Sequence, residues 1–309
     1  MGGSVRVGVT GASGLIGRSL VAALHERGDS IVTFVRPSTN DTTGQVVRWD
    51  PARGLIDEND LQRVGGFDAV VHLAGAGIAD RRWTTTRKEE ILSSRVASTT
   101  LLVEALQALK EGVTCLASGS AIGWYGSRGD DVLDETSPRG EGFLSNVCQQ
   151  WEAATSPLQS LATRVAHVRT GIVVSSLGGS LRRQLPLYRF GLGGRLGSGA
   201  QWLSPISLVD EVLALLWTID HQLSGPVNLT CPTPLTNKQF TNDLAHALRR
   251  PSLLAVPAPA LRLVLGAEMA DELVLASQRV MPDALTSSGF TFRHANAGAA
   301  LNWALSSRA

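Results

Sequence analysis

The sequence contains few cysteines and no long apolar run. Its 309 residues include three cysteines, Cys115, Cys148 and Cys231, whose spacing matches no metal-ligand pattern. An odd number of scattered cysteines is typical of reduced thiols, so we expect neither a disulfide framework nor a metal site. No stretch approaches 18 consecutive apolar residues, and an apolar strand pattern begins at Val5. We therefore expect no membrane span and no secretory signal peptide, and predict a cytoplasmic protein.

An excess of charge of either sign is also absent. The chain has 28 Lys and Arg residues against 27 Asp and Glu residues, a formal net charge of +1. This balance favours neither nucleic acid nor a membrane surface as a partner, although it is compatible with local charged patches. Lysine occurs only at Lys88, Lys110 and Lys238, so arginine carries almost all of the positive charge. The hydrophobic content of 43% is sufficient for the core of one large domain or two modest ones.

A glycine motif lies near the N-terminus, in the sequence VRVGVTGASGLIG at residues 5–17. An apolar strand pattern precedes it and a helical pattern follows it, which is the arrangement of a dinucleotide-binding turn. The first glycine permits the tight turn, the second lets the backbone approach a pyrophosphate, and the third lets helix and strand pack. The helix N-terminus then offers N–H groups to the phosphates. We predict cofactor contacts from Gly11, Ser13, Gly14, Leu15, Ile16 and Gly17; the alternative is a loop that only shapes the turn.

Apolar strand patterns alternate with helical periodicity as far as residue 175. The pattern predicts strands at 31–35, 45–50, 69–73, 113–117 and 165–174, and helices at 83–109 and 143–161. Repeated strand–helix units of this kind form a parallel sheet that is covered by helices on both faces. Right-handed crossovers then give an α/β, doubly wound Rossmann fold.

The residue at the end of the second predicted strand bears on the choice of cofactor. A carboxylate at this place holds the ribose 2′-hydroxyl of NAD, but here Arg36 follows the strand and the next carboxylate is Asp41. A guanidinium can bind a 2′-phosphate through charge-assisted hydrogen bonds that contribute about 1.5–3 kcal/mol. We therefore predict NADP as the cofactor; in the alternative, Arg36 is only a solvated strand end.

The composition of the sequence and its pattern of predicted elements change beyond residue 175. An irregular segment rich in Gly, Arg and Ser is followed by predicted helices at 207–220, 237–249 and 261–276 and by a short strand at 227–229. We predict an NADP-binding Rossmann domain over residues 1–175, to which 205–230 return. A smaller α/β substrate-binding lobe with a C-terminal helical region would span residues 176–309.

Several long stretches resemble one subgroup of the extended short-chain dehydrogenase/reductase superfamily. They are the TGASGLIG loop, HLAGAG after the fourth strand, RRWTTTRKEEILSSRVAST at 81–99, LGGRLGSGAQWLSPISLVDEV at 192–212, GPVNLTCPTPLTNKQF at 225–240, and the sequence at 265–293. The subgroup is the atypical, NAD-dependent epimerase-like YfcH/SulA-type family with its own C-terminal domain. The resemblance implies further cofactor contacts from Leu73, Ala74, Gly75, Glu90, Arg95 and Val173. For Glu90 and Arg95 an ordinary intrahelical ion pair is the alternative.

The resemblance also shows what the chain lacks. Ordinary members of the superfamily use a Tyr-x-x-x-Lys pair, but this chain has only Tyr125 and Tyr188, and neither is followed by lysine at that spacing. Leu144 and Cys148 stand in the corresponding slots, with Glu152 four residues later. Ser120, or else Ser118, matches the serine that usually contacts the substrate oxygen. Tyr125 could replace the lost acid or form an aromatic wall, and Cys148 is expected to be a buried structural cysteine.

Two functions remain open at this point. The first is an NADP(H)-dependent oxidoreductase or epimerase that acts on a small molecule, with nucleotide sugars as one candidate class and Ser120 and Tyr125 as catalytic candidates. The second is a catalytically silent NADP(H)-binding sensor or regulatory protein. The protein is expected to be a monomer or a homodimer. A group of arginines near the expected cleft suits a phosphorylated or carboxylated ligand, or else forms a solvated basic surface; they are Arg81, Arg82, Arg182, Arg183, Arg189 and Arg195.

Overall fold

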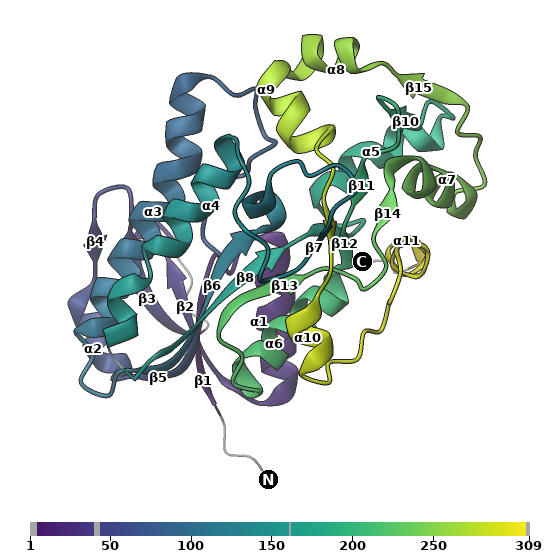
Figure 1. The fold of residues 1–309 in the computed structure, drawn as a ribbon. Helices are drawn as coiled ribbons and strands as arrows, with labels where there is room; N and C mark the ends of the chain where they lie inside the picture. Colours follow the sequence, from purple (N-terminus) through teal and green to yellow (C-terminus); the bar gives the residue numbers. More distant parts are fainter. Residues whose placement is uncertain (1–4, 40–43, 161, 307–309) are drawn as a thin grey trace.

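A central eight-stranded sheet forms the larger part of the molecule. The computed structural model describes residues 5–39, 44–160 and 162–306. The strand order is β13-β8-β6-β5-β1-β2-β3-β4, and all pairings are parallel except that of β4 with β3. This order confirms the predicted doubly wound α/β fold (Figure 1). The strands are β1 (Arg6–Thr10), β2 (Ser30–Val35), β3 (Gln45–Asp50), β4 (Leu55–Ile56), β5 (Phe67–His72), β6 (Val113–Ala121), β8 (Arg164–Thr170) and β13 (Gly225–Leu229).

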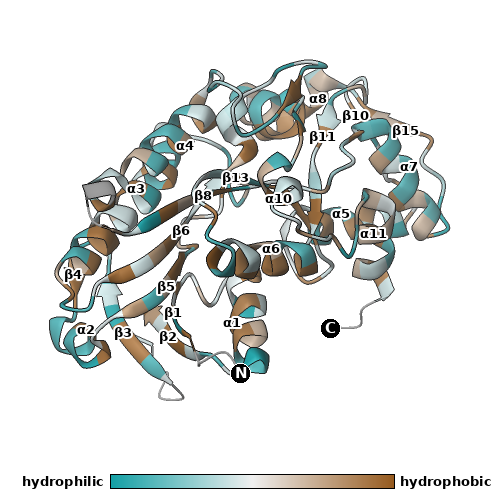
Figure 2. Cartoon of the chain, turned by 60° about the horizontal axis from the view of Figure 1, so that its bottom comes forward, coloured by the Kyte–Doolittle hydropathy of each residue, from teal (hydrophilic) through white to brown (hydrophobic). Residues whose placement is uncertain are grey.

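Alternating side chains of the strands build a core on each face of the sheet. On one face, side chains such as Val7 and Val71 pack with α1 (Leu15–Arg27) and α6 (Leu208–Asp220). On the opposite face, side chains of β2, β3 and β5 pack with helices α2 and α3. Burial on both faces explains why the strands read as nearly continuous apolar runs (Figure 2). The helices on the second face are α2 (Glu58–Val64), α3 (Thr85–Gln107) and α4 (Phe143–Ala153).

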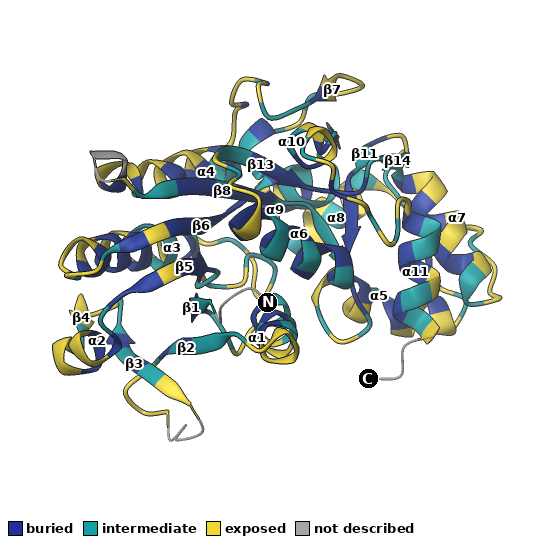
Figure 3. Ribbon diagram, turned by 90° about the horizontal axis from the view of Figure 1, so that it is seen from below, coloured by how far each residue is buried: buried dark blue, intermediate teal, exposed yellow. Residues whose placement is uncertain are grey.

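A second, smaller lobe lies beside the β13 end of the sheet. Its core joins α5 (Gly179–Arg189), α7 (Asn237–Ala247) and α11 (Ala297–Ser306). Four two-stranded pairs lie outside the central sheet: β9 (Ile172–Val174) with β12 (Pro205–Ser207), β10 (Gly194–Leu196) with β15 (Leu254–Val256), β11 (Trp202–Leu203) with β14 (Leu235–Thr236), and β16 (Arg279–Val280) with β7 (Val132–Leu133). Figure 3 shows that the strands of the central sheet are largely buried between helices that are partly exposed. No helix of the described residues is long and apolar enough to cross a bilayer.

The structure corrects several predicted element boundaries. The predicted strand 165–174 is divided into β8 and β9, and the predicted helix 143–161 ends at Ala153, with a 3-10 turn at Ser156–Ser160; Leu161 lies outside the described residues. The predicted helix 261–276 is wrong. It is replaced by α8 (Ala258–Leu265), α9 (Ala267–Met269) and a π-helical turn η3 (Ala270–Val274). The break falls at Gly266, whose φ of +92° is incompatible with a continuous helix.

Candidate functional site

The glycine turn after β1 has no room for side chains at two of its positions. A Cβ atom on Gly11, whose φ is +67°, would lie 2.8 Å from the carbonyl carbon of Leu73. A Cβ atom on Gly17 would lie 2.2 Å from the carbonyl oxygen of Gly11. The amide of Gly14 closes the turn by donating to the same oxygen at 2.9 Å. The loop therefore passes directly over the start of α1 and against the end of β5.

The N-terminus of α1 is open to a ligand. Gly14 is its N-cap residue, it has an extended backbone, and no side chain caps the helix. The N–H groups of the first turn lack intrahelical partners, and together with the helix dipole they attract an anion. Ser13 and Gly14 are exposed, and Leu15 and Ile16 are half-buried. The cradle thus fits a pyrophosphate, because the side chains that would fill it are absent.

A buried histidine fixes the two strand ends beside this turn. The amides of Leu73 and Ala74 donate to Thr10 Oγ1 at 3.0 and 3.2 Å, and the same oxygen lies 2.7 Å from His72 Nδ1. His72 Nε2 lies 3.0 Å from Thr99 Oγ1, which donates to the carbonyl of Arg95. Thr10 must therefore donate to Nδ1, and Nε2 carries the proton. Burial lowers the pKa of His72 to about 3, so the ring is a neutral connector.

Arg36 and Arg95 differ in how far they are exposed to solvent. Arg36 directly follows β2, is exposed, and forms no ion pair with a described residue; Asp41 lies outside the described residues. The side chain of Arg95 covers Gly75, where a Cβ atom would lie 3.3 Å from Cζ. Its guanidinium lies 5.1 Å from the centre of the Trp151 ring, and burial lowers its pKa to about 10.

The expected alternative, an ion pair between Glu90 and Arg95, is not formed. Glu90 instead binds Arg87 Nη1 at 2.5 Å, and Arg95 donates to the carbonyl of Ile91 at 3.0 Å. Arg95 therefore carries no carboxylate partner among the described residues. Val173 lies on β9 opposite Ile206 of β12.

A buried chain of hydrogen bonds begins at the predicted serine on β6. Ser120 Oγ donates to Glu152 Oε1 at 2.6 Å, and Arg169 binds both carboxylate oxygens of Glu152 at 2.9 and 3.0 Å. Arg169 Nη1 then donates to Tyr125 Oη at 3.0 Å, and Tyr125 donates to Asn228 Oδ1 at 2.8 Å. The Ser120 hydrogen is thus held by a carboxylate, and its oxygen is left as an acceptor.

The surroundings of Tyr125 disfavour the role of catalytic acid. Its side chain is 0% exposed, and burial raises its pKa to about 12. Its hydroxyl donates to Asn228 and accepts from Arg169, so it has no hydrogen left for a substrate. Ser118, the other serine considered for β6, is buried and its hydroxyl has no partner among the described residues. Ser120 is therefore the serine that joins the network.

Leu144 and Cys148, on α4, lie against the 3-10 turn (Ile122–Tyr125) that follows β6. A Cβ atom on Gly123 would lie 3.3 Å from Leu144 Cβ and 3.7 Å from Cys148 Sγ. Cys148 is buried, donates weakly to the carbonyl of Ala121, and has its pKa raised to about 11 by burial. Such a thiol is protonated at neutral pH and unreactive, as a structural cysteine would be.

The C-terminal segment around Glu272 packs against the start of α4, and a small cavity lies beside this contact. Glu272 caps the helix by accepting from the amides of Phe143 and Leu144 at 2.9 and 2.8 Å. A cavity of about 170 Å³ lies between this segment, α4 and the 3-10 turn at Ile122–Tyr125; it is lined by Gly123, Gly126, Ser127, Glu141, Leu144, Asp271, Glu272, Ala276 and Gln278. Leu144 thus connects the cavity with the helix that carries Cys148 and Glu152.

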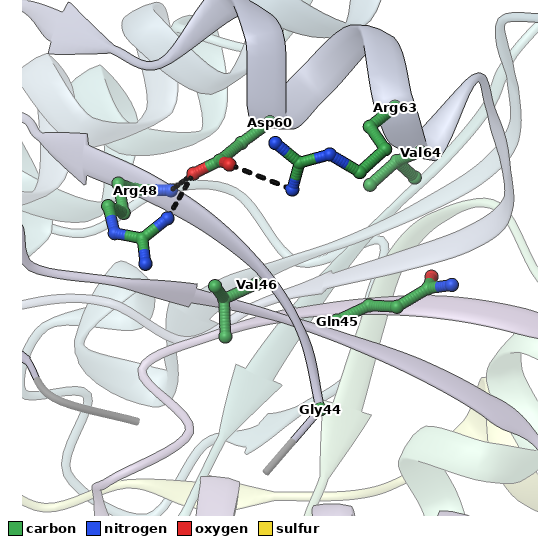
Figure 4. Close-up of a pocket in the computed structure, with 7 residues that line it drawn as sticks. All are labelled: Gly44, Gln45, Val46, Arg48, Asp60, Arg63 and Val64. Atoms are coloured by element: carbon green, nitrogen blue, oxygen red, sulfur yellow. Dashed lines mark hydrogen bonds and ion pairs between the residues drawn. The ribbon is translucent and has the colours of Figure 1, made fainter. Parts of the chain in front are cut away.

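A larger cavity, of about 260 Å³, lies elsewhere, between β3 and α2. Figure 4 shows that buried Asp60 lies among its lining residues and binds both Arg48 and Arg63. β3 is separated from β6 by three strands of the sheet. Because of this separation, the cavity is not part of the site at Ser120. No described group of three or more His, Cys, Asp or Glu side chains is arranged to hold a metal.

The six arginines expected around the cleft do not form one cluster. Arg183 binds Asp80, and Arg82 lies near Gly266, so these two join the 80–82 loop to the second lobe. Arg182 donates to the carbonyl of Leu177, and Arg189 and Arg195 are exposed at the end of α5 and on β10. Sequence reasoning missed Thr10, His72, Arg169 and Asn228. Thr10 and His72 gave a signal, since each is a polar residue at the end of an apolar strand.

Two family models match the sequence. One, described as the NAD dependent epimerase/dehydratase family, matches residues 7–145, and the other, described as a domain of unknown function (DUF1731), matches residues 256–304. The "Epimerase family protein Mb2239" of Mycobacterium bovis is 44% identical over 299 residues, which are 96% of this chain and 97% of the relative. The similarity therefore extends over both lobes.

Similar solved structures include two that are at least 30% identical to this chain. The human epimerase family protein SDR39U1 (isoform 2) with NADPH is 30% identical, with a TM-score of 0.87 over 97% of this chain and 99% of that chain. The nucleoside-diphosphate sugar epimerase from Corynebacterium glutamicum is 34% identical, with a TM-score of 0.77 over 96% of this chain and 57% of that chain.

Proposed function

Because the chain belongs to the NAD dependent epimerase/dehydratase family, we propose that it binds NADP(H) and acts as an oxidoreductase or epimerase on a small molecule. The observation that carries this proposal is the uncapped N-terminus of α1 beneath a glycine turn that leaves space for a pyrophosphate. The crystal structure of the human relative is one with NADPH, which supports the choice of nucleotide. The proposed substrate is a small molecule, with nucleotide sugars as one candidate class, and the proposed location of the protein is the cytoplasm.

Each part of the nucleotide has residues that suit it. The turn residues Gly11–Gly17 and the loop 73–75 would hold the pyrophosphate and adenosine, and Val173 would border the nicotinamide side. Arg95, a cation without a carboxylate partner among the described residues, would face a phosphate, and Glu90 would contribute from the same helix. NADP(H), when bound, supplies or accepts a hydride.

Ser120 is the group that would touch the substrate. Glu152 holds its hydrogen at 2.6 Å, so the Ser120 oxygen accepts a hydrogen bond from a substrate hydroxyl. A proton leaving that hydroxyl can pass to Ser120 while the serine hydrogen passes to Glu152, which Arg169 keeps oriented. The pair would thus supply the proton acceptor that the absent Tyr-x-x-x-Lys provides in ordinary members.

We expect Arg36→Ala to change nucleotide preference. Losing a charge-assisted contact of about 1.5–3 kcal/mol should weaken NADPH binding by about 10- to 100-fold, while NADH binding should stay the same. Titration calorimetry with both nucleotides measures the two dissociation constants. Equal losses of affinity for NADPH and NADH would mean that Arg36 does not bind the 2′-phosphate.

We expect Ser120→Ala to reduce NADPH turnover by about tenfold or more, with NADPH affinity unchanged. The assay follows nucleotide absorbance with a panel of carbonyl and alcohol substrates that includes nucleotide sugars. Ser118→Ala is the matched control, because Ser118 lies two residues away on the same strand and has no hydrogen-bond partner among the described residues. Equal turnover by the two variants would remove Ser120 from the chemistry.

Two observations favour the second candidate, a catalytically silent sensor. The Tyr125 hydroxyl is engaged by Asn228 and Arg169 in the buried network, and the sequence lacks a Tyr-x-x-x-Lys pair. It predicts that the protein binds NADPH but turns over no member of the panel. The double variant Leu144→Tyr with Cys148→Lys separates the two functions further. If turnover appears only in this variant, the natural site is not a reductase.

A further inference from the structure

Two segments of the second lobe contain no acidic residue. Residues 177–209 include four arginines, residues 244–267 include three, and neither segment includes an Asp or Glu. The segments meet where β10 pairs with β15, with Gly194 opposite Leu254. Residue 191 also lies against Pro251, since a Cβ atom at Gly191 would be 3.8 Å from the proline ring. Figures 1 and 2 show α8 following β15 along the same border of the lobe.

Most of the exposed large apolar side chains lie on these segments. Phe190 is 80% exposed, Leu253 92% and Leu263 78%. Of the ten large hydrophobic residues exposed in the described part of the chain, only Leu55 and Val132 lie elsewhere. We call the surface formed by residues 187–195 and 249–264 the arginine–leucine face. A concentration of this kind marks an interaction surface, because single apolar side chains are otherwise scattered. The remaining exposed apolar side chains of the face are Leu187, Leu192, Leu254 and Val264, and Leu177 lies on the first segment but outside the face.

Positive charge without a carboxylate partner lies beside these side chains. Arg189, Arg195, Arg249 and Arg250 are all exposed, and none forms an ion pair with a described residue. Arg262, on α8, is different because it binds Asp271 at 2.9 Å. The face therefore combines apolar side chains with at least four uncompensated guanidinium groups. Its ligand should be apolar in part and negatively charged.

We propose that the arginine–leucine face docks on the surface of an anionic lipid bilayer. Leucine and phenylalanine side chains enter the boundary between headgroups and acyl chains, while the arginines remain at the level of the lipid phosphates. Each arginine near an anionic surface contributes about 1 kcal/mol. Charge complementarity excludes a second copy of this face as the occupant, since two copies would bring eight arginines together without a counter-charge. The balanced net charge of the whole chain does not oppose such docking, because the charge is local.

Flotation of the full chain with lipid vesicles tests the proposal. Vesicles of phosphatidylcholine alone are compared with vesicles that contain phosphatidylglycerol in equal parts with phosphatidylcholine. We expect binding only to the anionic vesicles and its loss at high salt. Arg249→Ser with Arg250→Ser should weaken binding by about 30-fold, the equivalent of two arginine contacts. Phe190→Asp with Leu253→Asp should abolish it.

The control variant is Leu55→Asp with Val132→Asp, two residues that are each 58% exposed outside the face. It should bind the anionic vesicles as the wild type does. Equal binding to neutral vesicles, no binding to either kind, or equal weakening by the control would overturn the proposal. So would a concentration-dependent dimer in analytical ultracentrifugation that only the Phe190→Asp, Leu253→Asp variant loses, because a second copy would then be the occupant.

Discussion

Replacing Arg169 by methionine is expected to lower the free energy of unfolding by about 3–5 kcal/mol. Arg169 is 3% exposed and holds both oxygens of the Glu152 carboxylate. Its removal leaves this buried carboxylate with the Ser120 hydroxyl as its hydrogen-bond donor among the described side chains, and with His167 Nδ1 3.8 Å away. The variant also loses the guanidinium that lies 4.0 Å from the centre of the Trp124 ring. Urea denaturation followed by circular dichroism measures the change.

The comparison for this prediction is Arg63→Met. Arg63 also binds a buried carboxylate, that of Asp60, but its own side chain is 70% exposed and Arg48 remains on the same carboxylate. We expect its removal to cost less than about 1 kcal/mol. Adding Glu152→Gln to Arg169→Met should restore much of the lost stability, because no unpaired charge then remains buried. If Arg169→Met were no more destabilising than Arg63→Met, the network would not be a buried ion pair.

Replacing Gly17 by alanine is expected to weaken NADPH binding by at least about 100-fold, or about 2.7 kcal/mol. The new Cβ atom would lie 2.2 Å from the carbonyl oxygen of Gly11 and 2.8 Å from Ala12 Cα. Both are backbone atoms, so the whole turn must move away from α1. The first-turn amides would then no longer face the pyrophosphate together with the turn. Titration calorimetry gives the dissociation constant.

Two further glycine-to-alanine variants test whether the loss of NADPH affinity follows the closeness of the new Cβ atom to the backbone. Gly14→Ala places a Cβ atom 3.2 Å from the same oxygen, and we expect a smaller loss of about tenfold because a shift of a few tenths of an ångström is enough. Gly44→Ala meets no atom within 4 Å and should bind NADPH as the wild type does. Wild-type affinity in a folded Gly17→Ala protein would contradict the proposed cradle.

The sequence allowed the central sheet to be predicted well. Most of its strands are buried on both faces and are apolar runs long enough to detect between glycine- and polar-rich turns, as at Val7–Val9 and Ala69–His72. The two-residue, partly exposed edge strand β4 was not predicted. The C-terminal region was harder. The apolar spacing of residues 261–276 continues across Gly266, and periodicity alone does not reveal a change of chain direction at a positive φ. The final helix, α11, was missed in the same region.

Only those parts of the candidate site whose residues are close together in the sequence could be predicted. The glycine turn and Arg36 are read from neighbouring residues, although their roles in binding remain predictions. Tyr125 could not be assessed in this way, because its hydroxyl partners are 44 and 103 residues away. In the same way, a net charge of +1 is a sum over the whole chain and conceals the two segments without acidic residues.

The contact of Glu272 with α4 links the order of synthesis to the assembly of the site. The amides at the start of α4 receive their carboxylate partner from a residue 129 positions later in the chain. A growing polypeptide that has emerged only as far as the central sheet therefore lacks the group that fixes the helix bearing Glu152. We expect fragments that stop before this carboxylate to fold incompletely around Ser120, and lobes exchanged between relatives to need a matching carboxylate at this position.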